Sequence, residues 1–117
     1  MKVFVYFNLH RKVFSVKALE GSDRGRVIAH AAKLTLRDVT FKVSEAGRQR
    51  VLRERRKNVH AGVVGHWDGA LDAAIAAEND ISVTYNPYAY DSFVLRDREV
   101  PIHWASSAYL TDKKIFV

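Results

Sequence analysis

The sequence predicts a single α+β domain, in which an antiparallel sheet of hairpins is combined with one basic amphipathic helix. Three observations favour this class. Apolar and polar side chains alternate with a period of two through the first 43 residues, as in β-strands. A basic segment with helical spacing follows, and the strand pattern returns at residue 81. A length of 117 residues with 48% hydrophobic side chains is sufficient for one folded core.

The N-terminal part predicts two hairpins. Val3, Val5 and Phe7 alternate with other side chains, the polar stretch 10–12 interrupts the pattern, and residues 14–18 resume it. Glycines at both ends of the next stretch, 21–25, predict a turn.

Two further strands are expected at 27–31 and 33–43. In the second, Leu34 and Leu36 have the opposite parity to Val39 and Phe41. A bulge near Arg37 and Asp38 would place all of these side chains on one face. After residue 81 we expect strands at 81–85, 92–95 and 100–104, and a last hairpin that turns across 111–113.

The helix is predicted over about 44–61. Ser44 is a suitable N-cap, and Glu45 suits the positive end of the helix dipole. Val51, Leu52 and Val59 fall on one stripe that a surface helix would bury. A second, short Ala-rich helix is expected over about 68–78.

The positive charge is concentrated in the predicted helix. The chain has 19 Lys and Arg against 13 Asp and Glu, a net charge of +6. Six of these cations and one carboxylate, Glu54, lie between Arg48 and Lys57. Such a cluster suits nucleic acid, an anionic membrane or an acidic protein; we expect no membrane association.

Our leading hypothesis is a nucleic-acid-binding protein that contacts mainly phosphates, DNA or RNA. Two alternatives remain open: the cations face an acidic host protein that the chain inhibits or modulates, or they form a solvated helix surface. Arg48 and Arg55 lie beside the apolar stripe, so their charges need an acid or a route to water. The expected phosphate contacts are Arg48, Arg50, Arg53, Arg56 and Lys57, with Arg11 and Lys12 as a second patch.

Tyr85, Tyr88 and Tyr90 form an aromatic cluster around Pro87. Exposed rings here would stack on unpaired bases or anchor a protein partner. The alternative is that they are structural, because strand parity places Tyr85 in the core.

The sequence assigns no catalytic residue, metal site or cofactor. His60 and His66 are not spaced as zinc ligands, and no phosphate-binding glycine motif is present. A metal-independent ribonuclease that uses His60 as acid or base is a third, weaker hypothesis. We expect a cytoplasmic protein, because the chain lacks cysteine and a signal-peptide pattern. The oligomeric state is left open.

Three stretches resemble a family of small, functionally uncharacterised proteins of tailed bacteriophages and prophages. These stretches are MKVFVYFNLHRKVFSVKALEG, GRQRVLRERRKNVHAG and TYNPYAYDSFV, and the Ala-rich segment resembles the family least. The resemblance implies expression in an infected bacterium and an accessory role, such as modulating host machinery or protecting phage DNA. It implies no catalytic residue.

Overall fold

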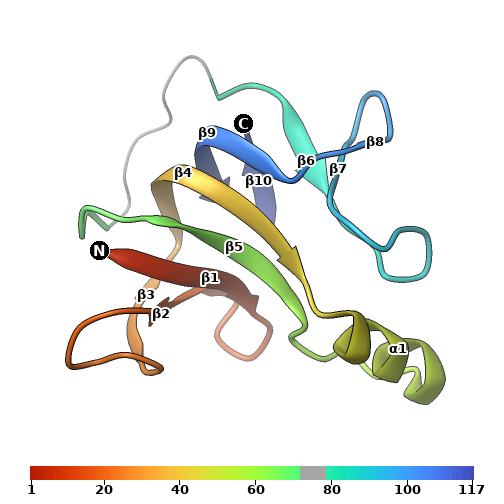
Figure 1. Ribbon diagram of the computed structural model, residues 1–117, viewed down its shortest axis with the longest axis horizontal. Helices are drawn as coiled ribbons and strands as arrows, with labels where there is room; N and C mark the ends of the chain where they lie inside the picture. The colour runs from red at the N-terminus through yellow and green to blue at the C-terminus, as the bar shows by residue number, and fades with distance from the viewer. Residues whose placement is uncertain (72–78) are drawn as a thin grey trace.

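The computed structural model describes residues 1–71 and 79–117 and shows a mostly β protein (Figure 1). Within these residues there is one antiparallel sheet of 10 strands and one helix of 10 residues. The predicted α+β class is therefore wrong. The antiparallel sheet of hairpins is present, but the helical part is much smaller than expected.

The strands follow the sequence pattern in the N-terminal half and are short near residues 94–101. Their bounds are β1 Lys2–Asn8, β2 Val13–Ala18, β3 Val27–Ala31, β4 Lys33–Val43, β5 Ala61–His66, β6 Ser82–Thr84, β7 Val94–Leu95, β8 Val100–Pro101, β9 Trp104–Thr111 and β10 Lys114–Phe116. The helix α1 covers Glu45–Glu54, between β4 and β5.

The sheet is curled, and the core lies on its concave face. Its strand order is β3-β2-β1-β5-β4-β9-β10-β6-β7-β8. Three strands lie between β1 and β10, yet Val5 and Ile115 from these strands line one hollow. The alternating side chains that the sequence marked as apolar, such as Val3 and Leu36, are fully buried in one cluster.

The expected bulge in β4 is confirmed. The pairing of β4 with β5 shifts between Arg37 and Thr40, and Asp38 has a φ of 48°. The extra residue changes the parity of the strand, so that Leu36 before it and Val39 after it are both fully buried.

The helix begins where predicted but ends at Glu54 instead of about residue 61. The Ser44 side chain accepts a hydrogen bond from the Gly47 amide, as an N-cap does, and Arg55 adopts the left-handed conformation that ends the helix. Val59 is exposed, so the predicted apolar stripe is wrong at that position.

The early end of the helix follows from the sheet. Ala61 pairs with Val43, the last residue of β4, so the chain must return to the place it left. A helix of this length advances about 15 Å. Residues 55–60, which are neither helix nor strand, are needed to cover that distance again. The helix projects from the end of the sheet (Figure 1).

The second expected helix, at about 68–78, falls mostly outside the described residues. Residues 68–71, its expected beginning, are not helical. None of the helical segments in the described ranges is long and apolar enough to cross a membrane.

Candidate nucleic-acid interface

A surface groove lies between the segment that follows α1, the end of β1 and the tyrosine segment 84–88. Its volume is about 630 Å³. Three side chains at the groove are well exposed: Leu9 is 44%, Val59 47% and Tyr88 59% accessible. Lys57 and Lys113 also line the groove. The groove thus combines exposed apolar and aromatic groups with cations.

Arg48 is a structural residue rather than a free cation. Its Nε donates to the carbonyl oxygens of Pro87 (3.1 Å) and Tyr90 (2.9 Å), and its Nη1 contacts a Glu45 carboxylate oxygen at 3.2 Å. Its side chain is only 17% exposed. The same network, with the hydrogen bond from Gln49 as its largest contribution, lowers the pKa of Glu45. Arg48 thus joins the helix to the tyrosine segment, and the expected phosphate contact by Arg48 stays a prediction.

The tyrosine segment is a built turn. The side-chain oxygen of Asn86 accepts a hydrogen bond from the Tyr88 amide. The backbone carbonyl oxygen of Asn86 accepts one from the Tyr90 amide at 2.8 Å. The Tyr90 hydroxyl donates to Glu99, which raises the pKa of Tyr90. Of the three tyrosines, Tyr88 is the most exposed, with 59% of its surface accessible.

Tyr85 is half-buried and bonded to His60. The His60 Nε2 lies 2.6 Å from the Tyr85 hydroxyl, and its Nδ1 lies 2.8 Å from the carbonyl oxygen of Asn58. Because a carbonyl only accepts, a neutral His60 carries its proton on Nδ1 and accepts at Nε2 from Tyr85. Burial raises the pKa of Tyr85 to about 12. Both ring nitrogens of His60 are thus hydrogen-bonded within the protein, and its role as the acid or base of a ribonuclease stays an untested prediction.

The other cations of the basic segment are exposed. Arg50 contacts Glu54 at 3.1 Å, one helical turn away, and its side chain remains 61% exposed. Within residues 1–71 and 79–117, no ion pair involves Arg53, Arg56 or Lys57. Arg53 lies in the last turn of α1. Arg55, Arg56 and Lys57 lie in the segment that connects α1 to β5.

The second expected patch lies next to the groove. Arg11 and Lys12 are exposed in the turn between β1 and β2. Leu9, the first residue of this turn, lines the groove. The Lys12 amide donates to the Asn8 carbonyl oxygen at 2.7 Å and closes the tip. Through Leu9, this tip borders the same groove as Lys57.

Two residues that line the groove were not singled out by the sequence patterns. Lys113 comes from the β9–β10 turn and Leu9 from the β1–β2 turn. The paired lysines at the tip of the expected last hairpin were a usable signal for Lys113. Nothing in the local sequence indicates that this tip reaches Phe7, over whose ring the Lys113 ammonium lies at 5.4 Å.

No group of three or more acidic or histidine side chains that could hold a metal ion is present in the described part of the chain.

A family model described as "Mycobacterium phage L5 gene 82 protein" matches residues 1–117. The "Gene 82 protein" of Mycobacterium phage L5 is 40% identical over 121 residues, which cover 98% of this chain and 94% of that protein. No solved structure matches the chain. The expected relation to a phage protein family is confirmed, and it extends over the whole chain, including the Ala-rich segment.

Proposed function

Given that this chain belongs to the gene 82 protein family of Mycobacterium phage L5, whose description names no activity, we propose that it binds nucleic acid at the groove and the cations around it. The proposal places this activity in the cytoplasm of an infected bacterium. Phosphates would contact Arg53, Arg56 and Lys57, with Arg11 and Lys12 along the neighbouring hairpin.

One observation carries the proposal: an exposed tyrosine and exposed cations border the same groove. Tyr88 is 59% exposed on a turn that Asn86 and Arg48 hold in place. Lys57 lines the groove with it, and the neighbouring Arg53 and Arg56 are exposed. Cations that follow a backbone, combined with a ring on which a base stacks, are the usual elements of single-strand binding.

The test is fluorescence anisotropy with labelled single-stranded and double-stranded DNA and RNA across a salt series. The variant Arg56→Gln with Lys57→Gln removes two cations, so it should weaken binding and reduce the slope of log affinity against log salt by roughly 1.4 to 1.8. A matched control, Arg24→Gln with Arg26→Gln, removes two exposed cations from the β2–β3 connection.

Tyr88→Ala should weaken single-strand binding by about 1–3 kcal/mol, with little effect on duplex. Absence of binding by the wild-type chain at low salt would refute the proposal. An equal loss in the control pair would also refute it, because binding would then depend on total charge rather than on this surface.

A second candidate is the inhibition or modulation of a host protein. The observation that favours it is the pair of exposed apolar side chains Leu9 and Val59 in the groove, which a nucleic-acid backbone does not need. A host protein that is retained after nuclease treatment, and lost with Leu9→Ser and Val59→Ser, would support this candidate. Retention that depends on nucleic acid would contradict it.

A further inference from the structure

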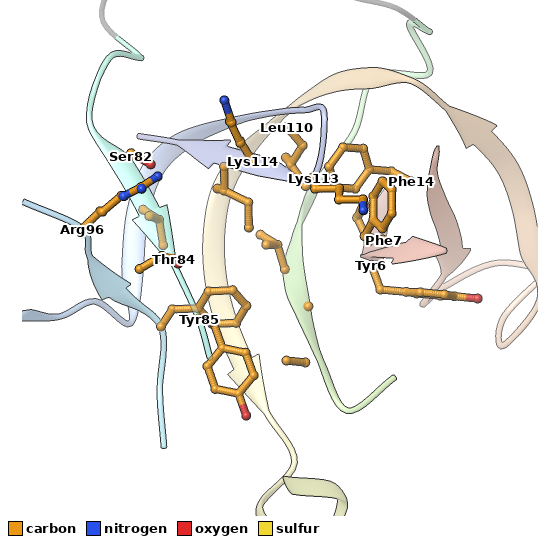
Figure 2. A pocket seen from close by; sticks show the side chains of 17 residues that line it. Tyr6, Phe7, Phe14, Ser82, Thr84, Tyr85, Arg96, Leu110, Lys113 and Lys114 are labelled. Atoms are coloured by element: carbon orange, nitrogen blue, oxygen red, sulfur yellow. The ribbon is translucent and has the colours of Figure 1, made fainter. Parts of the chain in front are cut away.

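A second hollow, of about 340 Å³, lies inside the curl of the sheet (Figure 2). Strands β1, β2 and β5 form one side of it, and β6, β9 and β10 form the other. It adjoins the groove described above, and the two share six lining residues: Tyr6, Phe7, Ala61, Thr84, Tyr85 and Lys113. Its volume falls at the lower end of the range for small-molecule sites.

The walls of this hollow combine apolar side chains with polar ones. Phe14, Val63 and Leu110 come from three different strands and are almost completely buried. Phe93 packs against Tyr85 with ring centroids 5.2 Å apart and adds an aromatic surface. An apolar ligand body would therefore meet hydrocarbon and aromatic groups on several sides.

Three cations border the hollow, and none of its described lining residues is acidic. Arg96, Lys113 and Lys114 are all exposed, so their charges are in contact with water at the opening. In Figure 2, Arg96 and Lys114 lie on the same side as Ser82, whereas Lys113 lies with Phe7 on the opposite side. The charges are thus at the edge and the apolar surface is inside.

Two tight turns fix the backbone positions from which these cations extend. The Arg96 amide donates to the Ser82 carbonyl oxygen at 2.9 Å, which fixes the start of the β7–β8 turn against β6. Asp112 and Lys113 have φ values of 47° and 66°, the left-handed pair of a two-residue hairpin turn. Lys113 already lies over the Phe7 ring, so Arg96 and Lys114 are the better candidates to bind an anionic group.

We propose that this hollow binds a small amphipathic anion, with a hydrocarbon or aromatic body and one carboxylate or phosphate group. The body lies against the partly accessible Phe7, Tyr85 and Ile115, and the buried Phe14, Val63 and Leu110 lie behind them. The anionic group lies at the opening, between Arg96, Lys114 and the Ser82 hydroxyl. The charged groups of the two sites differ: Arg96 and Lys114 line this hollow but not the groove, and Lys57 and Tyr88 line the groove but not this hollow.

The experiment compares sodium decanoate with decanol, which has the same chain length and no charge. Calorimetry with the wild-type chain should show decanoate binding more tightly than decanol. Methyl NMR should show the largest changes at Val63, Leu110 and Ile115, and none at Val27 or Val100, which are exposed elsewhere. Equal binding of the two compounds, or changes confined to the exposed methyls, would overturn the proposal.

Arg96→Gln with Lys114→Gln should weaken decanoate binding at least about tenfold and leave decanol unchanged. The control pair Arg24→Gln and Arg26→Gln, and the variant Tyr88→Ala, should keep wild-type affinity for decanoate. A second control tests whether the protein sediments with phosphatidylglycerol vesicles. If the protein sediments with the vesicles but does not bind decanoate, the proposal is overturned, because the ligand is then a lipid surface. Anisotropy with nucleic acid, measured on the same variants, separates failure of this site from failure of the groove.

Discussion

Two arginines seven residues apart, Arg48 and Arg55, show how differently the fold uses similar side chains. Arg48 donates to two backbone carbonyls and a carboxylate, whereas Arg55 ends the helix in a left-handed conformation and is exposed. The sequence places both beside the apolar stripe and predicts that their charges need partners or water. It does not indicate which one has partners, because Pro87 and Tyr90 are about 40 residues away from Arg48.

Replacing Arg55 by glycine should stabilise the protein. Its φ of 54° is costly for a residue with a Cβ and is without strain for glycine. We expect Arg55→Gly to raise the free energy of unfolding by up to about 1 kcal/mol, measured by urea denaturation. Arg53→Gly, inside the last helical turn, should lower it by a similar amount. A loss of stability in both variants would contradict this account of the helix end.

Tyr85 should make stability depend on alkaline pH. Burial raises its pKa from 10.0 to about 12, so the folded state keeps a proton that the unfolded state releases. This contribution is fully present below pH 10 and is lost as the pH rises through about 12. Urea denaturation of wild type and Tyr85→Phe should give a stability difference that changes over this pH range. A constant difference would show that the hydroxyl ionises equally in both states.

At the scale of elements, α1 and the tyrosine segment form one unit through Arg48. Arg48 lies in the first turn of the helix. Its neighbour Gly47 allows the helix to pack closely against His60, because a Cβ at position 47 would lie 2.5 Å from the His60 Cβ. The turn at Asn86–Tyr90 is satisfied internally and then fixed to the helix. The position of Tyr88 beside the groove therefore depends on a contact between two distant elements.

Arg48→Gln should lower the free energy of unfolding by about 1.5–3 kcal/mol, because charge-assisted hydrogen bonds to partly buried carbonyls are lost. Arg50→Gln, which removes an exposed ion pair with Glu54, should change it by no more than about 0.5 kcal/mol. Chemical denaturation measures both. Hydrogen exchange of the Tyr90 amide should also accelerate in Arg48→Gln. Equal effects of the two variants would show that Arg48 does not hold the turn.

At the scale of the whole molecule, the curled sheet joins distant parts of the chain into one core cluster. The ring centroids of Phe41 in β4 and Phe93 are 5.2 Å apart, and Phe93 in turn contacts Tyr85. The same curl brings the β9–β10 turn over Phe7. Both the groove and the inner hollow exist because the sheet folds back on itself.

Leu36→Ala should lower the free energy of unfolding by about 2–5 kcal/mol, because Leu36 is fully buried in β4. Leu9→Ala, at an exposed position, should stay within about 0.5 kcal/mol. Far-ultraviolet circular dichroism and the fluorescence of the buried Trp67 should report one coincident transition in each variant. Separate transitions would contradict the proposal that the chain is a single domain.

The sequence by itself determined the features that depend on near neighbours. The alternation around Val5, the bulge at Asp38 and the Ser44 cap are confirmed, because each results from local backbone geometry. The tertiary structure decided the rest. The pairing of Ala61 with Val43 shortened the helix and changed the fold class from α+β to mostly β. Long-range contacts made Arg48 structural and placed Lys57 and Tyr88 around one groove, because sheet curvature depends on all the strands together.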